Sequence, residues 1–236
     1  MISNKFGETA KAIFIMKDIL DFLADLGKNN NREWFERNRD RYEETRSKFL
    51  AFTELLNNEI KSFDPEVPML APKDCMFRIF RDVRFSNDKR PYKTNYGSFI
   101  SRGGRKSGYA GYYLHLQPGS SFLGGGVFMP PSANLKAIRQ EIFLDPEGFL
   151  SIKENPEFQK HLPDEYDARL KTAPRDFPKD WEYIHLLRNK SYAYGRNLTA
   201  EEILSPLFME NVLETFKVLS TMNQYLNQAI DDRLKS

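Results

Sequence analysis

Hydrophobic residues recur with a helical period at both ends of the chain. Near the start, four apolar side chains fall at i, i+3, i+4 and i+7 and are followed by Gly27, a frequent helix terminator. They are Ile19, Phe22, Leu23 and Leu26. Near the end, Ser205-Pro206 precedes an apolar stripe that runs from Met209 to Ile230. Both stretches predict amphipathic helices that bury one face.

Between these two, three further helices with recognisable caps are expected, in addition to short helices within residues 145–180 and one or two helical turns at residues 181–188. The longest covers residues 30–62, with Asn30 and Glu33 as its cap pair and an apolar side that includes Trp34, Phe35 and Tyr42. Ser132 is expected to cap a helix that ends near residue 143, and Thr199 with Glu202 forms the capping box of a short one.

The pattern in the middle of the chain predicts β-strands. Prolines at positions 65, 68 and 72 end the helical part, and residues 75–85, 108–117, 121–129 and 190–196 have strand-like patterns. Pro118-Gly119 predicts a turn that joins the second and third of these strands into a hairpin. The order of elements predicts an α+β fold, in which a central antiparallel or mixed sheet is flanked by N-terminal and C-terminal helices.

Length and composition favour one globular domain over residues 1–236. Residues 1–15 are expected to be a loosely held leader, and residues 145–200, rich in Pro, Asp and Glu, are a possible subdomain. Hydrophobic residues make up 40% of the chain and aromatic ones 14%, which excludes a disordered protein. A single cysteine excludes an internal disulfide, and the early apolar run at residues 12–16 is too short to span a membrane. These features predict a cytoplasmic protein with no membrane association.

Positive charge is concentrated in one part of the sequence. Residues 78–106 carry nine Lys or Arg and two Asp, a net charge of +7, whereas the whole chain is only +2, so the remainder sums to −5. Aromatic residues lie between the cations. Such a local positive field favours an anionic partner, either a small molecule or a nucleic acid.

Strand alternation would place Arg78, Asp82 and Arg84 on one face of the expected strand at 75–85. Because alternate residues on a strand lie about 7 Å apart, Asp82 could hold an arginine fork in place and leave other N–H groups for a ligand. The sequence from Arg78 to Tyr92, R-x-x-R-D-x-R-F-x-x-x-K-x-x-Y, resembles the signature of a bacterial and fungal family known as domain of unknown function 2461. The resemblance extends to N-N-x-x-W-F-x-x-N-R at residues 30–39 and to later G-Y-Y-L-H-L and L-G-G-G stretches, and it implies no activity.

The basic motif is the predicted ligand site. Its candidate ligand-binding residues are Arg78, Arg81, Arg84, Lys89, Tyr92 and Lys93. The arginines would hold a phosphate or carboxylate, and Tyr92 or Tyr96 would stack on a base or donate a hydrogen bond. The alternative is an ion-pair network that only fixes a loop.

Candidates for proton transfer are few. Asp82, Asp88 and His115 are the candidates for a catalytic role, with a hydrogen-bonded structural role as the alternative for His115. No H-x-x-x-H motif or cysteine pair points to a metal, and Cys75 is expected to be inert core. The glycines at positions 124–126 lack the P-loop lysine and the dinucleotide fingerprint, so they predict a bulge or a close backbone approach, and no cofactor is expected.

Three functions stay open on this reading. The first is a binding module for a phosphate- or carboxylate-bearing ligand. The second is an enzyme that acts on a phosphorylated or carboxylated small molecule. The third is a structural or interaction protein in which the motif is an ion-pair network. The sequence leaves the oligomeric state open.

Overall fold

The structure is a computed structural model that describes the backbone of residues 2–235 and the side chains of residues 15–234. Within that range the fold is α+β, as predicted, with ten helices and a five-stranded sheet. The helices are α1 (Ile2–Lys28), α2 (Arg32–Arg37), α3 (Arg39–Phe63), α4 (Pro72–Cys75), α5 (Ser132–Leu144), α6 (Pro146–Lys153), α7 (Pro156–His161), α8 (Ile184–Leu187), α9 (Ala200–Ile203) and α10 (Phe208–Lys235). The strands are β1 (Tyr96–Ser101), β2 (Gly111–Leu116), β3 (Phe122–Val127), β4 (Asp164–Glu165) and β5 (Tyr192–Asn197).

The sheet has the strand order β1-β2-β3-β5-β4, and every neighbouring pair is antiparallel. The predicted hairpin is confirmed, since β2 and β3 flank Pro118-Gly119 and Tyr113 lies opposite Gly124. Strand β5 overlaps the predicted stretch at residues 190–196 and ends one residue beyond it.

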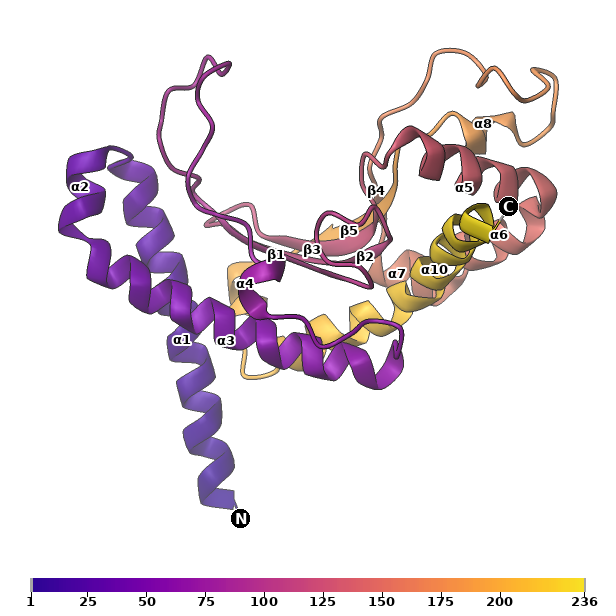
Figure 1. Cartoon of the computed structure of the whole chain (residues 1–236). Coiled ribbons are helices and arrows are strands. Elements are labelled where there is room, and N and C mark those ends of the chain that lie inside the picture. Colours follow the sequence, from indigo (N-terminus) through magenta and orange to yellow (C-terminus); the bar gives the residue numbers. More distant parts are fainter. Residues whose placement is uncertain (1, 236) are drawn as a thin grey trace.

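One face of the sheet is covered by helices. Helix α10 packs on β2 and β3, and α3 packs on β1. Tyr112 points to this side: its ring lies 5.2 Å from that of Phe216, and its hydroxyl donates to Asp64 at 2.6 Å. The opposite face lies between two projections, one formed by residues 77–93 and the other by α5, α8 and their connections (Figure 1). We call the projection at residues 77–93 the arm.

The predicted strand at residues 75–85 is wrong. Helix α4 ends at Cys75, and the chain then doubles back through the arm with isolated bridges between Met76 and Ser98 and between Phe80 and Tyr92. Closely spaced charged residues occupy the distal part of the arm, and most of them are exposed to solvent instead of being paired with a neighbouring strand. The stretch whose alternating pattern predicted a strand is therefore one limb of a doubled loop, without a continuous ladder of strand hydrogen bonds.

Two predicted helix caps are also wrong. The predicted helix at residues 30–62 is divided into α2 and α3 at Asn38, and the cap of α2 is Asn31, whose side chain accepts from the Trp34 amide at 2.9 Å. Pro131 occupies the N-cap position of α5, and Ser132 is its first residue. An N-cap residue has non-helical backbone angles, as Asn31 (φ −140°, ψ 165°) and Pro131 (φ −51°, ψ 144°) do. The capping box of Thr199 and Glu202 is confirmed.

The two segments singled out in the sequence, the expected leader at residues 1–15 and the possible subdomain at residues 145–200, form different elements of the structure. Helix α1 includes residues 2–15, whereas Met1 and the side chains of residues 1–14 lie outside the described residues. Residues 145–200 contribute β4 and β5 to the central sheet. Phe149, Phe158 and Tyr192 from this segment are buried in the same hydrophobic core as the rest of the chain.

The glycine run at residues 124–126 makes the close backbone approach that its composition predicts. Gly126 has φ of +94°, and a Cβ there would collide with the Tyr192 carbonyl oxygen. Gly124 and Gly125 face backbone atoms of the neighbouring strands in the same way. Side chains at these positions would push β3 away from its partners.

We expect Gly126→Ala to destabilise the protein. The left-handed φ and the steric conflict together should cost about 1–3 kcal/mol in the free energy of unfolding. Gly27→Ala is the control, because it lies in helix α1 with only the Thr94 methyl at 3.7 Å, and it should stabilise by up to about 1 kcal/mol. Urea denaturation measures both; equal midpoints for the two variants would contradict the role of Gly126.

Candidate functional site

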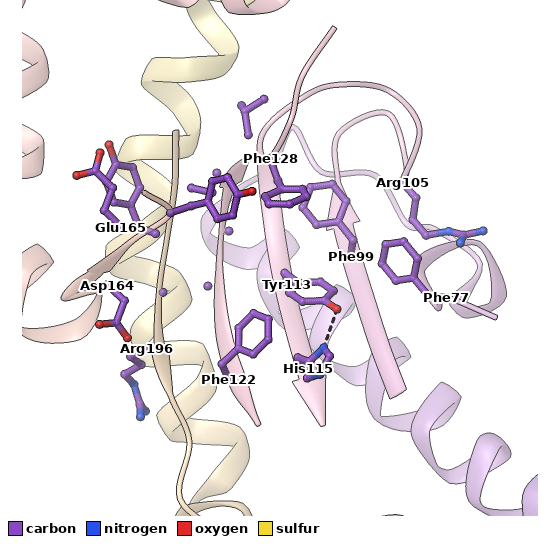
Figure 2. Close-up of a pocket in the computed structure, with 18 of the residues that line it drawn as sticks. Phe77, Phe99, Arg105, Tyr113, His115, Phe122, Phe128, Asp164, Glu165 and Arg196 are labelled. Atoms are coloured by element: carbon purple, nitrogen blue, oxygen red, sulfur yellow. Dashed lines mark hydrogen bonds between the residues drawn. The ribbon is translucent and has the colours of Figure 1, made fainter. Parts of the chain in front are cut away.

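A cavity of about 850 Å³ lies on the face of the sheet that α3 and α10 leave uncovered. Its floor comes from β1, β2, β3 and β5, and its edges come from the base of the arm, the loop before β2, and β4. Aromatic side chains dominate the floor (Figure 2). They are Phe99, Tyr113 and Phe122, and Phe128 lines the cavity just after the end of β3.

Strand register explains this floor. Phe99 lies opposite Tyr113, Tyr113 lies opposite Gly124, and Gly124 lies opposite Gly195, so one row of the sheet changes from aromatic rings to bare backbone. Because alternate residues share a face, this row points away from buried Tyr112 and its helices. The result is a shallow depression at the glycines beside a wall of rings.

His115 lies on the floor with both ring nitrogens engaged. Its Nδ1 accepts from the Tyr113 hydroxyl at 2.9 Å, the interaction dashed in Figure 2, and from the Asn95 amide at 3.4 Å. Its Nε2 therefore carries the proton and donates to the Gln117 side-chain oxygen at 3.1 Å. Burial lowers the pKa of His115 and raises the pKa of Tyr113 to about 12, so both rings are neutral near pH 7.

Two cations define one edge of the cavity. The Lys93 ammonium lies 5.6 Å and the Arg105 guanidinium 5.1 Å from the centroid of the Phe77 ring. Arg105 donates from Nε to the Asp74 carbonyl oxygen at 2.6 Å. No described carboxylate forms an ion pair with either cation. Burial lowers the pKa of Lys93, and the nearby charges of Arg78 and Arg105 lower it further.

The opposite edge carries acidic residues. Asp164 and Glu165 line the cavity from β4, across the floor from Arg105 in Figure 2. Glu165 already accepts from Lys153 at 2.9 Å and from Asn189 at 2.7 Å. The negative charge of Glu165 is therefore neutralised within the protein, whereas the positive charge of Lys93 is not.

The predicted ligand-binding residues separate into different environments. Lys93 lines the cavity. Arg78 is exposed to solvent, and its positive charge lies close enough to Lys93 to lower the pKa of that lysine. The remaining cations bond within the arm. Arg81 pairs with Asp88, Arg84 donates to Asp82 at 2.7 Å, and Lys89 donates to the Val83 carbonyl oxygen at 3.2 Å.

The two candidate stacking tyrosines lie in the core. Tyr92 is only 4% exposed and stacks on Phe35 with centroids 4.0 Å apart. Asn30 fixes its backbone, since the Asn30 amide donates to the Tyr92 carbonyl at 3.0 Å and its oxygen accepts from the Tyr92 amide at 3.1 Å. Tyr96 is also buried, with its hydroxyl 3.0 Å from that of Thr45.

Only one of the three catalytic candidates reaches the cavity. His115 lines it, whereas Asp82 and Asp88 lie on the arm. Hydrogen bonds from Arg84 lower the pKa of Asp82, and those from Arg90 and Arg81 lower the pKa of Asp88. Both carboxylates are therefore ionised hydrogen-bond acceptors for arginines and lie apart from His115.

Several lining residues carried no signal that singled them out in the sequence. Tyr113 and His115 share one face of β2 because they are two residues apart. Phe99 lies opposite Tyr113 and Phe122 lies opposite His115, so their place on that face can be assigned only once the register of β1 and β3 is known. Arg105 contributed to the local charge. No pattern in the sequence joined it to Phe77.

For metals, the described part of the chain contains no group of three or more His, Cys, Asp or Glu side chains able to hold an ion. Cys75 is buried, which raises its pKa to about 11 and suits an inert core residue.

A family model described as "Conserved hypothetical protein (DUF2461)" matches residues 18–225. The chain belongs to this family. The matched range includes the arm, the central sheet and every residue named above in the cavity, which confirms the resemblance drawn from the basic signature. No curated protein and no solved structure matches the chain. Across the described residues, no helix combines the length and apolar character needed to cross a membrane.

Proposed function

We propose that this family member binds a small ligand that joins a phosphate or carboxylate to a flat apolar body, and that the binding site is the cavity on the uncovered sheet face. The supporting observation is the pair of cations, Lys93 and Arg105, that share Phe77 at the cavity edge without a carboxylate partner in the described structure. A half-buried cation without a counter-charge is unfavourable, and a bound anion removes that cost.

The rest of the cavity suits the apolar part of such a ligand. Its volume, about 850 Å³, lies in the range of small-molecule sites. Phe99, Tyr113 and Phe122 offer ring faces and edges to a planar group, and the bare backbone at Gly124 and Gly195 lets that group approach the sheet. An anion at Lys93 would place the apolar body over this floor.

The arm has a different role in this proposal. Within the arm, Arg81 pairs with Asp88 seven residues further along the chain, and Arg84 pairs locally with Asp82. This corresponds to the ion-pair network considered as an alternative for the motif. A nucleic acid is the less favoured partner, because Arg81 and Arg84 already pair with Asp88 and Asp82, whereas Lys93 and Arg105 border a concave cavity.

A thermal-shift comparison tests the proposal. Benzoate and phenyl phosphate should raise the melting temperature, and benzyl alcohol, which lacks the charge, should not. Arg105→Ala should weaken the response by about tenfold or more in ligand concentration, because a charged hydrogen bond contributes roughly 1.5–3 kcal/mol.

Lys106→Ala is the matched control for that comparison. Lys106 is an exposed cation in the same loop but does not line the cavity, so its removal should leave the ligand response unchanged. A response to short oligonucleotides that survives Arg105→Ala and is abolished by Arg84→Ala with Lys89→Ala would overturn the proposed site and favour the arm.

A further inference from the structure

The Lys93 amine is placed to react as well as to bind. We propose that Lys93 captures the carbonyl carbon of an anionic carbonyl compound, of the 2-oxo carboxylate class, as a covalent imine. This inference rests on the proposed function of the cavity and deepens it, because it names the ligand class and the atom that the protein attacks.

Backbone contacts hold the Lys93 side chain at the cavity edge. The Lys93 amide donates to the Ile79 carbonyl oxygen at 2.8 Å, across the base of the arm. The preceding residue, Tyr92, is fixed by Asn30 and stacked on Phe35. The base of the arm is therefore anchored, and the Lys93 ammonium is half-buried beside Phe77.

The surroundings of Lys93 favour the neutral amine that imine formation needs. Burial and two neighbouring cations, Arg78 and Arg105, lower the pKa of Lys93, and no described carboxylate forms an ion pair that would hold its proton. A lysine desolvated in an apolar pocket beside another cation is an activated nucleophile. Lys48 and Lys153, by contrast, pair with carboxylates.

The same neighbours suit the anionic part of the ligand. Arg105 lies over the same Phe77 ring and spends one N–H on the Asp74 carbonyl, which leaves the fork of its terminal nitrogens for a carboxylate. A 2-oxo carboxylate carries its carbonyl carbon directly beside that group. Binding the carboxylate at Arg105 would therefore bring the carbonyl toward Lys93.

The reaction balances without a further reactant. The Lys93 ammonium first loses a proton to solvent. Its nitrogen lone pair then forms a bond to the carbonyl carbon while the oxygen takes up a proton. The nitrogen then loses a second proton to solvent and, with its lone pair restored, expels this hydroxyl, which leaves as water after a second protonation. The net change converts one ammonium and one ketone into one protonated imine and one water.

Reductive trapping tests the inference on the full chain. Phenylpyruvate, which combines a ketone, a carboxylate and an aromatic ring, is incubated with the protein and sodium cyanoborohydride, and the product is measured by intact mass and peptide mapping. We expect a single reduced adduct on Lys93. Lys93→Arg, which keeps the charge, should lose the adduct, and Lys106→Arg should retain it. An adduct spread over surface lysines, or one that persists in Lys93→Arg, would overturn the inference.

Binding measured in parallel separates this inference from the proposed function. If benzoate shifts the melting temperature but phenylpyruvate gives no adduct on Lys93, the imine is refuted and the anion site stands. If neither compound binds, both proposals fail.

The pH profile of trapping gives a second readout. Trapping should increase as pH rises through the pKa of Lys93, with a midpoint below the ordinary value of 10.5. Arg105→Ala removes one of the charges that lower this pKa, so its midpoint should move to higher pH. A profile that does not change in this variant would contradict the coupling between the two residues.

Discussion

Replacing Lys93 and Arg105 together by glutamine should lower the affinity for benzoate by about 10²- to 10⁴-fold. Glutamine keeps much of the length of each side chain and removes both charges. The cavity then has no unneutralised cation at its Phe77 edge, while the aromatic floor of Phe99, Tyr113 and Phe122 stays intact. Isothermal titration calorimetry measures the loss, and the effect of added salt should shrink with it.

The control for this double variant removes the same charge from the arm. Arg84→Gln with Lys89→Gln should leave benzoate affinity within about threefold of the wild type, because neither residue lines the cavity and only screened, long-range charge is lost. Equal losses of benzoate affinity in the arm variant and the cavity variant would refute the proposed binding site.

Tyr92→Ala should lower the free energy of unfolding by about 3–5 kcal/mol, a cost typical of large-to-small changes at buried aromatic residues. Tyr92 is 4% exposed, and its ring stacks on Phe35 and lies 5.6 Å from that of Phe80. Its loss would leave a void beneath the base of the arm. Urea denaturation followed by circular dichroism measures the change.

Tyr92→Phe is the matched variant. The Tyr92 hydroxyl has no hydrogen-bond partner among the described residues, so removal of the hydroxyl alone should cost less than about 1 kcal/mol. If Tyr92→Phe is as destabilising as Tyr92→Ala, the hydroxyl rather than the stacked ring is the important group, and the packing described here is wrong.

The sequence predicted those parts of the fold that depend on local patterns. The amphipathic stripe from Met209 to Ile230 became α10, and the Pro118-Gly119 turn joined β2 to β3. Helical period and turn chemistry act over a few residues, so they can be read from one sequence. The N-cap of α2 lies one residue from its predicted position, at Asn31, which is the usual uncertainty of a predicted helix boundary. The break at Asn38 was not predicted.

The arm shows where local patterns fail. Alternating residues at 75–85 predicted a strand, yet no long neighbouring strand pairs with this stretch, and only isolated bridges form. Alternation identifies two faces and does not identify a partner. The contact of Asn30 with Tyr92 across 62 residues likewise depends on the folded chain. It brings together the two stretches that carry the family resemblance.

The cavity depended on the same kind of long-range arrangement. Arg105 contributed to the sequence's net positive segment, and Lys93 was a predicted ligand-binding residue. Their position over one phenylalanine, Phe77, depends on how the arm and the loop before β2 meet at the sheet. Charge counting located the segment that contains both residues, and the folded structure adds that Arg81 and Arg84 pair with Asp88 and Asp82 whereas Lys93 and Arg105 do not pair with a described carboxylate.

A crystal structure of the protein with 4-bromobenzoate would show where the anion binds, because anomalous scattering locates the bromine independently of the protein map. We predict a bromine peak over the aromatic floor between Phe99 and Phe122, with the carboxylate directed to Lys93 and Arg105. A peak beside Arg84 or Lys89 on the arm, with the cavity empty of ligand, would contradict the account.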